Sequence, residues 1–290
     1  MHLRITALLA LLTAFPIAAM AGEASGEFTA GTRVPIHPKY AAAFETRDQR
    51  DAHKVAIEVV LSEAPVDIAA AVAELDPHSQ VINQPALMKG NYILLWVRPG
   101  NDVSMNATYS DGMVQFADMT GSIGSLTAEL TTNTLDNVAG HVFTKKPVKT
   151  SKESYSVNLQ FSTAVTRLPK GTKLPADGGP AGKALQSLLS AIAKKNLDGI
   201  KASVTPENVK HLTDEDRSAE ENLANAIETL GFWLPKKSVK IIGGEQRDDA
   251  AVLDVEGEIF EGQKALYQVR MVKRDSHWLF DRATKAGLID

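Results

Sequence analysis

The chain has 290 residues, a formal net charge of −4 at pH 7 and no cysteine. These figures exclude disulfides, thiolate metal sites and a cysteine nucleophile, and a weakly acidic chain lacks the basic surface typical of nucleic-acid-binding proteins. Hydrophobic residues make up 44% and charged residues 23% of the chain. Such proportions are typical of a globular protein, here long enough for two domains.

Residues 1–21 have the pattern of a secretory signal peptide. A basic start and an apolar stretch over residues 5–15 precede the small-residue cleavage site Ala19-Met20-Ala21. The apolar stretch is shorter than the roughly 20 residues that cross a bilayer. We therefore expect cleavage between Ala21 and Gly22, a periplasmic or secreted location in a bacterium, and no membrane span after the signal is removed.

A segment rich in backbone breakers divides the rest of the chain. Residues 168–182, LPKGTKLPADGGPAG, hold three prolines and four glycines, too many for the interior of a helix or a strand. Strand patterns dominate before this segment, whereas helices and then strands follow it. The sequence therefore predicts a linker over residues 168–182 between a β-rich domain at 22–167 and an α+β domain at 183–290.

The first domain is expected to be an antiparallel β-sandwich with one short helix. Residues 55–61 alternate in the way of a strand with one well-buried face, with Glu58 on the other face. Residues 65–75 open with proline and favour the short helix. Tyr92 to Val97 is apolar on both faces, as expected of a central strand. Five further short segments between residues 103 and 163 have strand spacing.

The second domain is expected to place three helices before an antiparallel meander. Apolar spacing predicts helices over residues 180–195 and 205–212, and a third that starts near Ser218 and stops at Gly231. Four strands are expected at residues 238–243, 250–258, 264–273 and 277–282.

Two stretches of this second domain carry a family resemblance. The helix ALQSLLSAIAKKNLDGI and the run VLDVEGEIFEGQKALYQVRMVKRDSHWLFD, over about residues 181–283, resemble the nuclear transport factor 2-like superfamily, which includes ketosteroid-isomerase-like and SnoaL-like proteins. The resemblance implies a cone of three helices on a curled antiparallel sheet. It implies no activity, because the superfamily holds enzymes as well as binding modules and no isomerase motif is found here.

A row of acidic residues marks one face of the predicted meander. A hairpin turn at residues 261–263 would place Asp254 opposite Arg270, and a turn at Asp275-Ser276 would place Asp281 on the other side of Arg270. We interpret this ladder as a solvated charged face; the alternative is an acid–base site inside the cone.

Aromatic residues supply the candidate binding surface. Phe232 and Trp233 follow the third helix near an open end of the domain, and Trp278 lies in the last hairpin. They are candidates for binding a ligand or partner, with core packing as the alternative. The histidines, His78 and His141 among them, show no paired spacing, so no metal site and no cofactor are predicted.

These patterns favour an exported, non-enzymatic binding or interaction module that takes a periplasmic protein or a small apolar ligand, and no nucleic acid. Two alternatives remain open. One is an isomerase, hydratase or hydrolase that uses a buried carboxylate in the cone, and the other is a structural protein of the cell envelope.

Overall fold

The computed structural model describes residues 22–110, 115–151, 153–235, 237–260 and 262–289. The predicted signal peptide, with Ala21 at its end, lies outside the described residues. The first described strand begins at Gly22.

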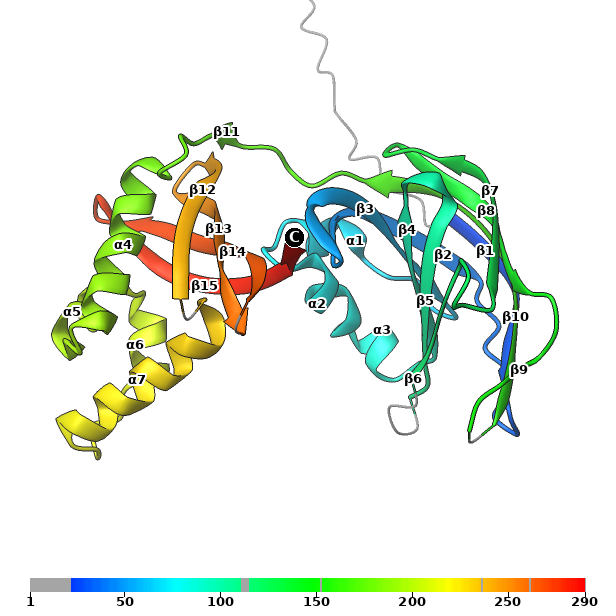
Figure 1. Cartoon of the computed structure of the whole chain (residues 1–290), viewed down its shortest axis with the longest axis horizontal. Coiled ribbons are helices and arrows are strands. Elements are labelled where there is room, and N and C mark those ends of the chain that lie inside the picture. Colours follow the sequence, from blue (N-terminus) through cyan, green and yellow to red (C-terminus); the bar gives the residue numbers. More distant parts are fainter. Residues whose placement is uncertain (1–21, 111–114, 152, 236, 261, 290) are drawn as a thin grey trace, which may run out of the picture.

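The N-terminal part is built around one ten-stranded sheet, here called the first sheet (Figure 1). Its strands run in the order β6-β5-β4-β3-β2-β1-β10-β8-β7, with β9 paired to β10. They are β1 (Gly22–Ala30), β2 (Tyr40–Asp48), β3 (Asp51–Ser62), β4 (Tyr92–Arg98), β5 (Asp102–Thr108), β6 (Gln115–Met119), β7 (Leu126–Asn133), β8 (Asn137–Thr144), β9 (Val148–Lys149) and β10 (Ser154–Thr166), with a 3-10 turn η1 (Pro99–Asn101) before β5.

The first sheet is nearly closed, so the prediction of a β-sandwich is wrong. A sandwich needs two separate sheets, but here hydrogen bonds link all ten strands. Strand β10 is 13 residues long and pairs with β1, β8 and β9, and at its end it pairs parallel with β2. The two ends of the path also meet, since β7 contacts β5 and β6. Long strands that bend around one interior therefore replace the two expected layers.

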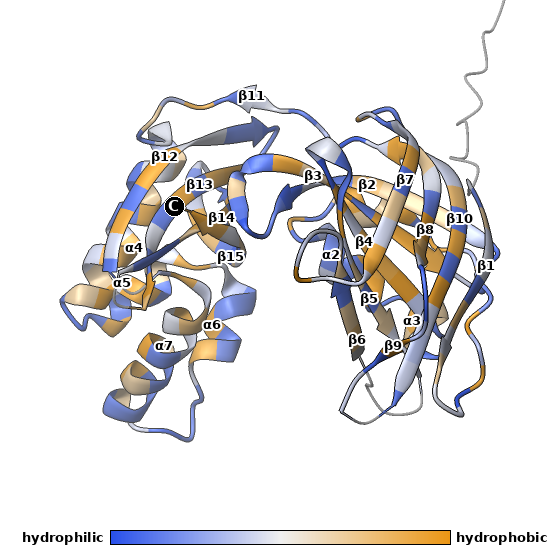
Figure 2. Ribbon diagram, turned by 45° about the vertical axis from the view of Figure 1, so that its right-hand side comes forward, coloured by the Kyte–Doolittle hydropathy of each residue, from blue (hydrophilic) through white to orange (hydrophobic). Residues whose placement is uncertain are grey.

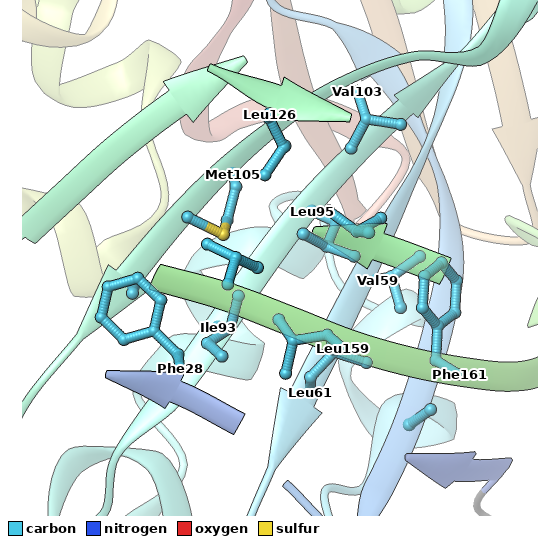
Figure 3. Close-up of a cluster of buried hydrophobic side chains, with 14 of the residues drawn as sticks. Phe28, Val59, Leu61, Ile93, Leu95, Val103, Met105, Leu126, Leu159 and Phe161 are labelled. Carbon is cyan, nitrogen blue, oxygen red and sulfur yellow. The ribbon is translucent and has the colours of Figure 1, made fainter. Parts of the chain in front are cut away.

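The interior of the first sheet is packed with apolar side chains. Phe28, Leu61, Leu95, Met105 and Leu159 converge there from different strands and are all buried (Figure 3). Along β10, hydrophobic and hydrophilic residues alternate (Figure 2), so one face fills this interior and the other faces out.

Three short helices, α1 (Ile68–Val72), α2 (Pro77–Ile82) and α3 (Pro85–Met88), cover the outer face of β3 and β4. The prediction placed one helix here. Asp76 caps α2 and both Pro77 and Pro85 occupy first helical positions, so each proline begins a new helix. Leu94 and Trp96 of β4 are buried beneath these helices, which confirms a strand apolar on both faces.

The C-terminal part combines four helices with a five-stranded sheet, here called the second sheet, in the order β11-β12-β13-β14-β15. The helices are α4 (Gly179–Ala193), α5 (Leu197–Ser203), α6 (Pro206–Leu212) and α7 (Ala219–Trp233), and the strands are β11 (Thr172–Lys173), β12 (Lys237–Arg247), β13 (Ala250–Phe260), β14 (Gln263–Arg274) and β15 (His277–Ile289).

Several local predictions for this part are confirmed. Thr205 caps α6 and Pro206 is its first residue, and Ser218 caps α7 with Glu221 completing a capping box. The meander β12 to β15 is antiparallel. The predicted linker, however, is not free chain. Its Leu168 packs beneath the helices of the first sheet, and its strand β11 pairs with β12.

The prediction of a three-helix cone is wrong. A fourth helix, α5, begins at the Asn196 cap, where the sequence predicted only the end of the preceding helix. The helices lie on one face of the second sheet, and Leu188, Leu230, Met271 and Phe280 pack together in the space between. The fold is therefore a nearly closed β-sheet followed by a filled helix-on-sheet layer, because apolar side chains from both layers occupy the expected cone.

Candidate functional site

The two sheets meet along the charged face of the second sheet. Arg47 of β2 donates from Nη2 to Oδ2 of Asp254 on β13 over 3.2 Å, and the Leu288 amide donates to the Gln49 carbonyl over 3.0 Å. Ala52 packs with Leu266 and Ile289 at the same contact. The polar face that the sequence assigned to solvent is thus largely an interface between the two parts.

The segment between α1 and α2 fastens this interface from the side. Glu74 accepts hydrogen bonds from Arg270, over 3.3 Å, and from Arg282. Asp76 accepts one from the Thr284 hydroxyl over 3.2 Å. His78, two residues after Asp76, contacts Glu58 of β3 in the first sheet. Residues 74–78 therefore hold β14 and β15 against β3.

A cavity of about 720 Å³ lies between the two sheets and this segment. Its lining mixes polar and apolar residues and comes from both parts of the chain. The side chains that carry its charge and hydrogen-bonding groups are Glu45, Thr46, Arg47, Gln49, Glu58, Glu74, Asp76, His78, Glu245, Arg247, Gln263, Gln268, Arg270, Thr284 and Lys285.

A buried ion pair stands at one wall of the cavity. Glu58, on the outer face of β3, is only 1% exposed, and its Oε1 lies 2.6 Å from Nδ1 of His78. The His78 ring also packs on Trp96, with ring centroids 6.0 Å apart. Burial of a carboxylate without a partner costs free energy, and the contact with His78 offsets that cost for Glu58.

Both members of the pair have a raised pKa. Burial raises the pKa of Glu58, and the charge of Asp76 adds to the rise, while the hydrogen bond from His78 opposes it. Burial lowers the pKa of His78, but the hydrogen bond and the negative charges of Glu58 and Asp76 outweigh burial and raise it. Protonated His78 is therefore favoured beside Glu58.

Two cations at the cavity have no acidic partner. Among the residues that the structure describes, no ion pair joins Arg247 of β12 or Lys285 of β15 to a carboxylate. Arg47 is engaged by Asp254, and Arg270 by Glu74 and Asp281. The cationic groups of these two side chains are thus available for a ligand, and the carboxylates of Asp76 and Glu245 on the same cavity likewise have no cationic partner among the described residues.

The predicted ladder of Asp254, Arg270 and Asp281 forms only in part. Asp254 lies opposite Gln268 and pairs with Arg47, whereas Arg270 lies opposite Arg282. The second contact exists, because Nε of Arg270 is 3.5 Å from Oδ2 of Asp281. Burial raises the pKa of Asp254, and the guanidinium of Arg47 offsets only part of the rise. These residues face the first sheet, away from the helices.

The predicted aromatic surface is divided between core and solvent. Trp233 stacks on Phe280 with centroids 6.0 Å apart, and Trp278 is partly buried against the same core. Phe232 is 78% exposed and borders an apolar groove of about 580 Å³. The groove lies between the ends of α4 and α7 and the start of β12, and Leu189, Ile192, Ile227, Leu234, Pro235 and Val239 line it.

Sequence reasoning missed the Glu58–His78 pair. It placed Glu58 on the less buried face of its strand and treated His78 as one scattered histidine. A usable signal was present: Val60 and Trp96 share that face with Glu58, and two large apolar residues indicate a face that other elements cover. For the described residues, no group of three or more His, Asp or Glu side chains is arranged to hold a metal ion.

No family model, no curated protein and no solved structure matches this chain. The resemblance of residues 181–283 to the nuclear transport factor 2-like superfamily therefore stays a prediction. Within the part of the chain that is described, no helix has the length and hydrophobicity needed to cross a membrane.

Proposed function

We propose that this chain is a non-enzymatic binding protein whose ligand is a small polar molecule held in the cavity between the two sheets. The observation that supports it is a cavity of about 720 Å³ lined from both parts of the chain. This volume is in the range typical of small-molecule sites, roughly 300–1,000 Å³. The charged lining favours a polar ligand there over the apolar one that the sequence suggested.

The walls of the cavity suit a preformed site. The contacts of Glu74 and Asp76 with β14 and β15, and of Arg47 with Asp254, tie the two parts together around it. A site whose walls are already in place loses little conformational entropy when a ligand binds. The cavity is also lined by side chains whose hydrogen-bonding groups no described residue engages, namely those of Arg247, Gln263, Gln268 and Lys285.

The test is to fill the cavity. Ala250 lines it, and Ala250→Trp would occupy its volume, whereas Ala117→Trp changes an exposed alanine on β6 as the matched control. Native mass spectrometry of the protein from its host should show a retained small molecule, and a library of polar metabolites should contain a compound that raises Tm. We expect both effects in the wild type and in Ala117→Trp but not in Ala250→Trp. A wild type that neither retains nor responds to any such compound contradicts the proposal.

We also propose export to the periplasm, because of the signal-peptide pattern. N-terminal sequencing of the protein from a bacterial periplasmic fraction should begin at Gly22. Recovery of the chain only from the cytoplasm with residues 1–21 intact would contradict this.

A second candidate function is the binding of a small apolar molecule in the α4–α7 groove, which the exposure of Phe232 favours. The chain offers a matched control, because Phe260 is also exposed, at 72%, and does not line the groove. Phe232→Ser should reduce the fluorescence of bound Nile red, and Phe260→Ser should leave it unchanged. Equal loss in both variants would show only non-specific adsorption.

A further inference from the structure

His78 is placed to meet whatever occupies the cavity. Its Nδ1 is engaged by Glu58 at 2.6 Å, and because Glu58 is almost fully buried this contact fixes the orientation of the ring. The ring lines the cavity and the side chain is 31% exposed. Among the described residues, Nε2 of His78 has no hydrogen-bond partner. Nε2 is therefore the nitrogen available to a ligand.

The protonated ring presents Nε2 as a hydrogen-bond donor, since both nitrogens of a cationic imidazole carry a proton. Its immediate partner, Glu58, favours that form. A donor that is charged and partly shielded from water binds an anionic oxygen more strongly than a neutral acceptor.

The other charged groups around the cavity are nearly balanced in number, and they differ in which of them already have a partner. Their acids already accept hydrogen bonds: Glu45 from Arg167, Glu74 from Arg270 and Arg282, Asp76 from Ser79 and Thr284, and Glu245 from the Gly171 amide. Asp76 and Glu245 accept hydrogen bonds from neutral groups only. Of the bases, Arg47 pairs with Asp254 and Arg270 with Glu74, whereas Arg247 and Lys285 pair with no described acid.

We propose that His78 binds an oxyanion of the ligand, a carboxylate or a phosphate, through its Nε2–H. Glu58 acts as a positioning residue that holds the ring, and Arg247 and Lys285 add positive charge. The inference rests on the proposed function, because it requires that the cavity hold a ligand. It specifies the class of that ligand as a small organic acid or phosphate and not a neutral polar molecule such as a sugar.

The experiment follows the imidazole resonances of the full folded chain by NMR while acetate, succinate or inorganic phosphate is added. We expect the His78 signals to shift with saturation, and the pKa of His78 to rise when the anion is bound. Above that pKa, affinity should fall by about tenfold per pH unit, as for one linked proton. Comparison of the carboxylates with phosphate identifies the oxyanion.

Three variants separate the roles. His78→Gln should weaken anion binding by at least about tenfold, the loss expected for one charge-assisted hydrogen bond. Glu58→Gln, which keeps a hydrogen-bond acceptor beside the ring, should fold and should lower the pKa of His78. His141→Gln, which removes a partly exposed histidine that contacts Asn158, is the control and should bind like the wild type.

The outcomes distinguish this inference from the proposal that it extends. Anions that perturb Arg247 and Lys285 but bind His78→Gln as tightly as the wild type would overturn the role of His78 and leave a binding cavity. Binding of neutral sugars with no response to any anion would overturn the ligand class. A cavity that no compound perturbs would overturn both.

Discussion

The same strands form both faces of the second sheet, but one face packs against the helices and the other borders the cavity. One face presents Leu253, Val269, Met271 and Phe280 to the helices and is dry and closely packed. The other presents Asp254, Arg270 and Thr284 to the first sheet and borders a cavity. Because side chains alternate along a strand, the same strands form the apolar face and the polar face. The strands that stabilise the C-terminal part therefore also line the candidate site.

This contrast predicts that truncations on the two faces differ in their effect on stability. Phe280→Ala should lower the free energy of unfolding by about 3–5 kcal/mol, because Phe280 is fully buried and stacks on Trp233. Thr284→Ala, on the same strand but the cavity face, should cost only about 1 kcal/mol, the net value of one hydrogen bond. Urea unfolding followed by circular dichroism measures both. Equal losses would mean that the cavity face is as closely packed as the core.

The contact between the two parts predicts the next largest effect. A Cβ at Gly287 would lie 2.8 Å from the backbone oxygen of Asp48 and 3.0 Å from Cα of Gln49, so a side chain there forces the strands apart. Gly287→Val should destabilise the protein by about 1–3 kcal/mol, as overpacking does. It should also expose the Leu288 amide to hydrogen exchange, since that amide bonds to Gln49. Unchanged protection of Leu288 would indicate that the interface is loose.

The Glu58–His78 pair predicts a pH dependence that the helix-covered face does not have. The folded-state pKa of His78 lies above its unfolded value of 6.5, so its stabilisation is complete below that pH and is lost as the pH rises through the folded pKa. The raised pKa of Glu58 acts in the same direction. As the pH rises from 6.5 through the folded pKa of His78, the free energy of unfolding should fall more steeply in the wild type than in His78→Gln. Parallel profiles would remove the pair as the source.

The smallest effect is expected from the ion pairs at the rim. The Glu74 side chain is 38% exposed, so its bonds to Arg270 and Arg282 are screened by water. Glu74→Gln should change the free energy of unfolding by less than about 1 kcal/mol. The part of the wild-type stability that these ion pairs contribute should depend on salt, and that dependence should be absent in Glu74→Gln. A larger loss, measured by urea unfolding at low and high salt, would show that residues 74–78 hold the two parts together more than burial does.

The hairpin registers show how far sequence reasoning reached. In the last hairpin the predicted turn at Asp275-Ser276 and the pairing that follows from it are confirmed up to the pair Met271 and Phe280. Beyond that pair a bulge shifts the register and places Arg282 opposite Arg270. In the preceding hairpin Phe260 pairs with Gln263 and not with Lys264, a displacement of one residue, and an irregularity between Glu258 and Phe260 adds a second. The partner of Asp254 is therefore displaced by two residues, to Gln268. An even displacement keeps every side chain on its predicted face but exchanges its neighbours.

The sequence by itself determined the helix starts at Thr205 and Ser218, the antiparallel meander and the division of its strands into apolar and charged faces, because caps and alternation act within a few residues. Only the tertiary structure decided what covers each face. Glu58 can be buried because His78, which belongs to another element, contacts it. Arg270 contacts Glu74, which lies 196 residues earlier in the chain. Alternation along a strand sets which residues share a face, but the closure of the first sheet and the docking of the second onto it depend on long-range packing.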